Sequence, residues 1–150
     1  MIDPERGIRP EDIILDIYEE TVQDAYSRIL FFLKERGFGN LAVLLNTGLI
    51  RYITKGVLAI EYYNAEKIGF YLFVFKNTLM KGKNSLYYIP PRSNINVIAV
   101  GVNARNSYNT LKWPTIARCL RDPSAVNNIV KLSNTHKIAA YINYFKYDGK

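Results

Sequence analysis

The chain lacks most of the residues from which catalytic and metal sites are usually built. It has one cysteine, Cys119, and one histidine, His136, among 150 residues. A single cysteine cannot form an internal disulfide, and one cysteine with one histidine cannot complete a zinc site. Neither of the standard glycine-rich phosphate loops is present. The sequence therefore predicts no cofactor, no metal site and no catalytic residue, and it favours a protein that is not an enzyme.

Long hydrophobic runs are missing as well. No apolar run reaches the roughly 18 residues of a membrane span, and the N-terminus lacks the basic-then-apolar order of a signal peptide. The composition, with 49% hydrophobic residues but only nine glycines and six prolines, excludes disordered and collagen-like chains. We expect one cytoplasmic domain over residues 1–150, with residues 1–9 disordered.

Acidic residues are almost absent from the second half of the chain. Residues 1–66 carry 7 basic and 11 acidic side chains, a net charge of −4, whereas residues 67–150 carry 13 basic and 2 acidic ones, a net charge of +11. Such a basic segment repels itself unless a polyanion or an acidic surface offsets the charge. Nucleic acid is the polyanion that lysine and arginine most commonly bind, so the charge pattern predicts a nucleic-acid partner.

Hydrophobic periodicity predicts an α+β fold. Apolar residues recur at three- or four-residue steps from about Pro10 to Arg36, which predicts a long N-terminal amphipathic helix that ends at Gly37. The middle of the chain is rich in β-branched and aromatic residues. It predicts a four-stranded antiparallel sheet of two hairpins, with strands at 57–63, 68–76, 86–89 and 95–102.

The last third of the chain returns to a helical pattern. Two or three short helices are expected there, at about 115–121, 125–132 and 136–145. The long N-terminal helix should cover one face of the sheet, because a sheet of this size needs a second layer to bury its apolar face. No repeat and no flexible linker divides the chain.

Basic and aromatic residues together define the candidate site. Aromatic side chains among lysines and arginines suit unpaired bases, which stack on aromatic rings with little regard to sequence. The sequence therefore predicts a binder that prefers single-stranded nucleic acid and leaves DNA and RNA undistinguished. The predicted nucleic-acid-binding residues are Lys76, Lys81, Lys83, Tyr87, Tyr88, Arg92, Arg105, Lys112, Trp113, Arg118 and Arg121.

A helix-turn-helix is the main alternative. Residues 115–132 resemble this motif, although the spacing is about one residue short and Pro123 lies where many such motifs have a small residue. In a duplex-binding regulator of this kind, the side chains of the second helix would face the major groove. Those residues would be Ser124, Asn127, Asn128 and Lys131.

Two further alternatives stay open. A metal-dependent nuclease could use Glu61 and Glu66 with Asp16 or Glu19 and with Lys67, because two carboxylates can hold Mg²⁺. A self-assembling structural protein could bring the acidic half of one subunit against the basic half of another, as a homo-oligomer. His136 with Tyr141 or Lys137 is the only available pair for metal-free acid–base chemistry, and Cys119 is expected to be a small buried residue.

Overall fold

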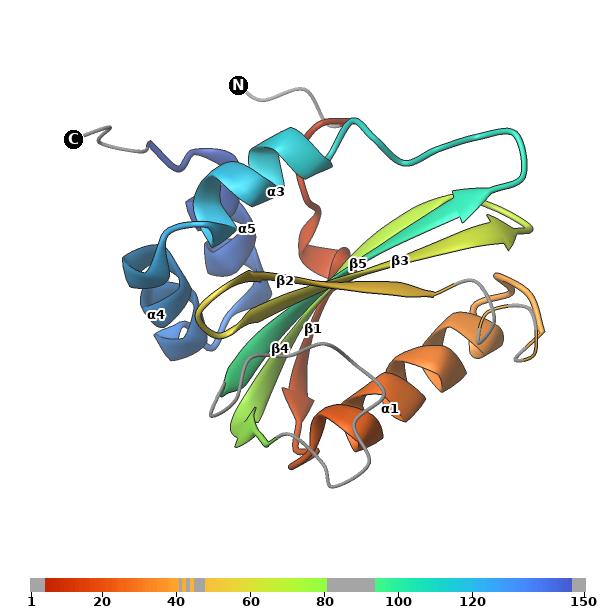
Figure 1. Cartoon of the computed structure of the whole chain (residues 1–150). Coiled ribbons are helices and arrows are strands. Elements are labelled where there is room, and N and C mark those ends of the chain that lie inside the picture. Colours follow the sequence, from red (N-terminus) through yellow and green to blue (C-terminus); the bar gives the residue numbers. More distant parts are fainter. Residues whose placement is uncertain (1–4, 41, 43, 45–47, 81–93, 147–150) are drawn as a thin grey trace.

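A five-stranded mixed sheet forms the centre of the protein (Figure 1). The structure is a computed structural model, and it describes residues 5–40, 42, 44, 48–80 and 94–146. The strand order across the sheet is β1-β4-β5-β3-β2. The strands are β1 (Ile13–Ile17), β2 (Leu49–Thr54), β3 (Val57–Ala65), β4 (Gly69–Leu79) and β5 (Ile95–Ala104).

The pairing of these strands corrects the predicted antiparallel sheet. β1 runs parallel to β4 and β3 runs parallel to β5, whereas the β2–β3 and β4–β5 pairs are antiparallel. β3 and β4 follow one another in sequence, but they do not form the predicted hairpin because β5 lies between them. Nearly all of β5 is buried, which suits a central strand with both faces covered. The predicted strand at 86–89 lies outside the described residues.

The N-terminal segment also differs from the prediction. There is no helix from Pro10; a 3-10 turn, η1 (Pro10–Asp12), leads directly into β1. The first α-helix, α1 (Val22–Glu35), begins where the Thr21 side chain accepts a hydrogen bond from the Asp24 backbone N–H, 3.1 Å away. Such a cap fixes the start of a helix. The isoleucines of β1 fit a helical period as well as a strand, and pairing with β4 decides between them.

The helices form layers on both faces of the sheet. α1 lies alone on one side, and α3 (Trp113–Leu120), α4 (Pro123–Lys131) and α5 (Thr135–Asn143) lie together on the other (Figure 1). These three helices lie within a few residues of those predicted for the last third of the chain. Among the described residues, no helix combines the length and the apolar character needed to cross a membrane.

Each face of the sheet has its own apolar core. The α1 face is rich in aromatic side chains, including Tyr62, Phe73 and Phe75, which pack with α1 residues such as Leu33. The opposite face contains mainly aliphatic residues of the sheet, and these pack with residues of α3, α4 and α5. Successive residues of β4 alternate between the two cores, so this strand is buried on both faces and its aromatic rings are not an exposed platform.

Candidate functional site

Two neighbouring hollows open beside the segment that leads into α3. One lies over the middle of β3 and β5, and the other lies where the chain leaves β5 and where β4 begins. The first, here called the tryptophan hollow, measures about 410 Å³ and lies between α3 and the sheet. Its lining residues come from β2, β3, β5 and α3 and from the segment before α3. They are Arg51, Ile53, Glu61, Ala99, Thr110, Trp113, Pro114, Ile116, Ala117, Leu120 and Arg121.

Glu61 and Arg51 form the polar wall of the tryptophan hollow. Glu61 accepts a hydrogen bond of 2.7 Å from the hydroxyl of Tyr63, and this bond, together with partial burial, raises the pKa of Tyr63. The other carboxylate oxygen of Glu61 lies 3.8 Å from Nη2 of Arg51. That separation is an ion pair but too long for a hydrogen bond, so the exposed guanidinium keeps its hydrogen-bonding capacity.

Trp113 packs closely against the sheet beside this hollow. A Cβ atom on Gly101 would lie only 2.9 Å from Cζ2 of Trp113, so the indole ring needs glycine beneath it. The ring also contacts Phe70 edge to face, with 4.9 Å between the ring centroids. The indole Nε1 is buried and has no hydrogen-bond partner within the described part of the chain. An unpaired buried donor costs roughly 1–3 kcal/mol of stability, and native proteins rarely contain one. Trp113 is therefore a candidate functional residue.

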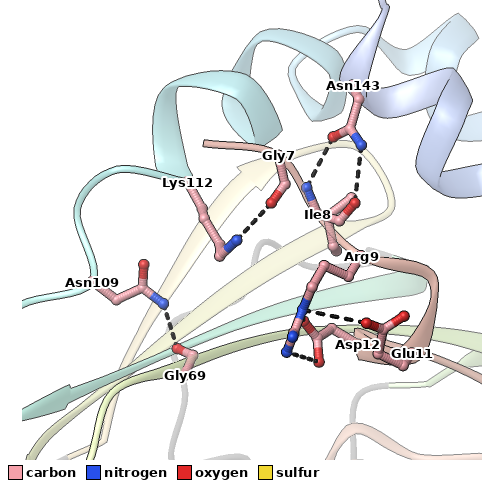
Figure 2. A network of polar contacts seen from close by, with 9 residues as sticks. All are labelled: Gly7, Ile8, Arg9, Glu11, Asp12, Gly69, Asn109, Lys112 and Asn143. Carbon is pink, nitrogen blue, oxygen red and sulfur yellow. Dashed lines mark hydrogen bonds and ion pairs between the residues drawn. The ribbon is translucent and has the colours of Figure 1, made fainter. Parts of the chain in front are cut away.

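The second hollow, here called the Arg9 hollow, measures about 520 Å³ and meets the first at Thr110. Arg9 in its wall donates two hydrogen bonds to the carboxylate of the buried Asp12, at 2.8 and 3.2 Å, and approaches Glu11 at 3.6 Å. The pairing with Asp12 raises the pKa of Arg9. Figure 2 shows this cluster beside the segment that leads into α3.

Hydrogen bonds between side chains and the backbone join the segments beside the Arg9 hollow (Figure 2). The Lys112 Nζ donates to the carbonyl of Gly7 over 2.6 Å. The Asn143 side chain bonds both to the N–H and to the carbonyl of Ile8, each at 2.9 Å. Asn109 donates to the carbonyl of Gly69 over 2.6 Å. The chain before η1, the segment before α3 and the start of β4 are thereby fixed relative to one another.

Exposed apolar side chains surround the two hollows. Ile68, Tyr108 and Leu111 line the Arg9 hollow, and Leu49 pairs with Glu61 at the edge of the tryptophan hollow. Their exposed fractions are 48%, 59%, 49% and 58%, respectively. We call these four residues, Leu49, Ile68, Tyr108 and Leu111, the docking face. Apolar residues grouped in this way at the surface mark interaction sites more often than scattered ones do.

The residues predicted to bind nucleic acid are distributed over several parts of the structure. Lys76, on β4, lies 3.8 Å from Asp16. Trp113 and Arg121 line the tryptophan hollow, and Lys112 lines the Arg9 hollow. Arg118 is exposed on α3 and Arg105 follows β5. The other five, Lys81, Lys83, Tyr87, Tyr88 and Arg92, lie outside the described residues.

The candidates for catalysis are not brought together. Among residues 5–40, 42, 44, 48–80 and 94–146, no group of three or more histidine, cysteine, aspartate and glutamate side chains could hold a metal ion. Cys119 is fully buried, and burial raises the pKa of its thiol to about 12, so it is inert at neutral pH. His136 is exposed in the first turn of α5, which Asn134 caps.

Sequence reasoning missed Arg51 and the docking face. Arg51 is one residue of a short exposed strand, and nothing near it in sequence indicates that Trp113 lies beside it. Glu61 is recognisable in the sequence as a candidate site residue, because it is a single carboxylate within the apolar run Val57 to Tyr63. A charge in such a strand needs a partner or access to water, and here Arg51 and Tyr63 supply the partners.

The fold is similar to that of several IIA proteins. The chain superposes on the nitrogen regulatory protein IIA-Ntr of Neisseria meningitidis with a TM-score of 0.67, at 12% identity, over 92% of this chain and 97% of that one. IIA mannitol of Escherichia coli gives 0.67 and 12%, over 90% and 98%. A putative PTS IIA of Streptococcus mutans gives 0.65 and 12%, over 89% and 87%. No protein-family model and no curated protein matches the sequence.

This likeness contradicts the prediction of a nucleic-acid-binding protein. Solved chains that share the fold include a nitrogen regulatory protein, IIA mannitol and putative PTS IIA proteins, and the contradiction covers the single-strand, helix-turn-helix, nuclease and structural-assembly versions. The helix pair of the second version exists as α3 and α4, but Asn128, one of its proposed reading residues, donates to the hydroxyl of Tyr141. Net charge misled the prediction because it reports what could attract a polyanion and says nothing about the shape of the site.

Proposed function

We propose that the protein is a regulatory docking domain that binds a protein partner at the end of the sheet where β3 and β5 finish. The exposure of the docking face is the observation that supports this proposal. Its four apolar side chains are about half exposed although the chain has two well-packed cores in which such residues can be buried. Exposed apolar residues around hollows are typical of interfaces, where they fill pockets of the partner or accept its anchors.

The composition of the docking face fits an interface rather than a defect in packing. Tyr108 contacts Tyr63 edge to face, with 6.4 Å between the ring centroids, so its ring is held in place while much of it stays exposed. Aromatic residues are enriched in the centres of interfaces because they supply contact area at little entropic cost. Charged groups border the same region, with Arg9 and Lys112 at one hollow and Arg51 at the other, as in an interface rim.

The likeness to IIA proteins supports a protein partner. One of the similar structures is a nitrogen regulatory protein, and two others are putative PTS IIA proteins. At 12% identity this likeness supports the fold and makes the activity an analogy. We place the docking activity in the cytoplasm, the compartment that the sequence predicts.

Phosphoryl transfer is a second candidate function, and one observation favours it. A carrier needs a nucleophilic side chain, for which an imidazole is suitable. His136 is the only histidine of the chain, and it is exposed at the start of α5, where the helix dipole favours negative charge. It lines neither hollow. Incubation with a phosphoryl donor should then add one acid-labile phosphate to the wild type and none to His136→Gln.

Photo-crosslinking tests the docking proposal. A photoreactive phenylalanine analogue placed at Leu111 or Tyr108 should capture a discrete protein partner in cells of the source organism. The same analogue at Phe31, which is equally exposed but lies on α1, is the matched control and should not capture that partner. Capture of the same partner at Phe31 and not at Leu111 or Tyr108 would contradict the proposal.

A further inference from the structure

The tryptophan hollow has the size and lining of a small-molecule site. Its volume of about 410 Å³ falls within the roughly 300–1,000 Å³ of ordinary ligand pockets. One wall is apolar, with Ile53, Ile116 and Leu120, and the opposite side carries the charged groups of Arg51, Glu61 and Arg121. A pocket that combines a large apolar wall with a few converging polar groups binds ligands that have both characters.

Two guanidinium groups with spare hydrogen-bonding capacity reach this hollow. Arg51 approaches its carboxylate partner only to 3.8 Å, and Glu61 already accepts a shorter bond from Tyr63 on its other oxygen. Arg121, at the end of α3, also lines the hollow and forms no ion pair with an acidic residue in the described part of the chain. Guanidinium groups bind carboxylates with two parallel hydrogen bonds, so the pair is suited to an organic acid.

Trp113 supplies a flat apolar surface and an unused donor beside these arginines. The guanidinium carbon of Arg51 lies 5.9 Å from the centre of the Trp113 ring. Nε1 of the same ring is buried without a hydrogen-bond partner in the parts of the chain that the structure describes. Native proteins rarely leave such a donor unpaired. This edge of the ring packs on the sheet, where Nε1 would lie 3.1 Å from a Cβ atom on Gly101.

We propose that the tryptophan hollow binds a small organic acid with a flat apolar body. The carboxylate lies between Arg51 and Arg121, and the body packs against Trp113 and the apolar wall of Ile53 and Leu120. Glu61 disfavours ligands that carry more than one negative charge, because a second anionic group would approach its carboxylate. This site adjoins the docking face through Leu49, which pairs with Glu61, but its ligand does not depend on the identity of the protein partner.

The fluorescence of Trp113 reports directly on the hollow, because it is the only tryptophan of the chain. Titration with phenylacetate, the probe acid, should give a saturable change in emission. Phenylacetamide has the same body without the charge and should bind at least about tenfold more weakly, because charge-assisted hydrogen bonds are lost. Inorganic phosphate, which has no apolar body, should bind more weakly than phenylacetate.

Arginine variants test where the carboxylate of the ligand binds. In the double variant Arg51→Gln with Arg121→Gln, the affinity for phenylacetate should fall at least about tenfold. Arg118→Gln is the matched control, because Arg118 is exposed on the same helix but does not line the hollow. Circular dichroism and thermal unfolding check that each variant is folded.

A second measurement does not depend on any variant. The single indole N–H gives one resonance in a nitrogen-15 spectrum, and it should shift on addition of phenylacetate. Absence of a saturable change in both emission and resonance up to about 10 mM, a dissociation constant too weak for specific binding, would overturn the proposal. So would equal affinities for the acid and the amide, or for the double variant and the wild type. Crosslinking at Leu111 is unaffected by these outcomes, so failure here leaves the docking proposal standing.

Discussion

The two faces of the sheet differ in how completely they are packed. On the α1 face, a single helix covers large aromatic residues such as Phe73 and Tyr62, and this core has few polar groups. On the other face, three short helices cover smaller residues, and an arginine and a glutamate lie at its edge beside Trp113. The α1 face, here called the closed face, therefore contributes mainly to stability. The face covered by α3, α4 and α5, here called the open face, is packed less completely where the tryptophan hollow lies.

The difference follows from residue size. Gly101 and Ala99 lie beneath α3 on the open face, and the ring of Trp113 occupies the room that Gly101 leaves. On the closed face, the rings of Phe32 and Phe73 meet edge to face with 5.1 Å between their centroids. Large interlocking rings leave no room for a ligand, whereas small residues beneath a short helix do. The comparison predicts different costs for substitutions on the two faces.

The largest loss of stability is expected from a substitution on the closed face. Phe73→Ala should lower the free energy of unfolding by about 3–5 kcal/mol, because the removed ring leaves a cavity in a dense core. Ile53→Ala, in the wall of the hollow, should cost only about 1 kcal/mol, because Ile53 is partly exposed and already borders open space. Urea denaturation of the two variants measures both values. Equal losses would show that the faces are packed alike.

A smaller effect is expected where Trp113 meets the sheet. Gly101→Ala should cost about 1–3 kcal/mol, because the new methyl group would lie 2.9 Å from the indole ring and force it to move. In a Trp113→Leu background the same substitution should cost much less. The coupling energy from the double-mutant cycle measures this contact. A Gly101→Ala cost that is unchanged in the Trp113→Leu background would argue against it.

The open face should also lose stability in alkali through Cys119. Burial raises the pKa of this thiol to about 12, whereas an unfolded cysteine ionises near pH 8.5. Above pH 8.5 the unfolded state releases the proton and the folded state keeps it, so stability falls with pH by up to about 1.4 kcal/mol per unit. Urea midpoints from pH 7.5 to 10 should decline less steeply in Cys119→Ala. Identical slopes would mean that the thiol is not buried in solution.

Local features of the fold could be predicted from the sequence, whereas its connectivity could not. The end of the first helix at Gly37 and the short helices of the last third depend on neighbouring residues, and the structure contains both. The placement of β5 between β3 and β4 depends on contacts between distant segments. No periodicity within a strand specifies which strand will be its neighbour, so the sequence alone predicts a hairpin wherever a short turn joins two apolar strands.

The candidate site was predicted only in fragments for the same reason. The sequence predicts Trp113 and Arg121 as functional residues, but as contacts to nucleic acid. Arg51, which completes the tryptophan hollow with them, is far away in sequence and meets them only because β2 is the edge strand beside β3. The docking face also combines residues from separate segments. Exposure of an apolar side chain is a property of the folded surface, and composition does not report it.

The affinity for the crosslinked partner tests the central claim that the docking face is the working surface. By calorimetry, the double variant Ile68→Ser with Leu111→Ser should bind that partner at least about tenfold more weakly than the wild type, because interface anchors cost more than 1 kcal/mol each. Phe31→Ser, an equally exposed residue on α1, should bind like the wild type. Unchanged affinity in the double variant, or an equal loss in Phe31→Ser, would contradict the account.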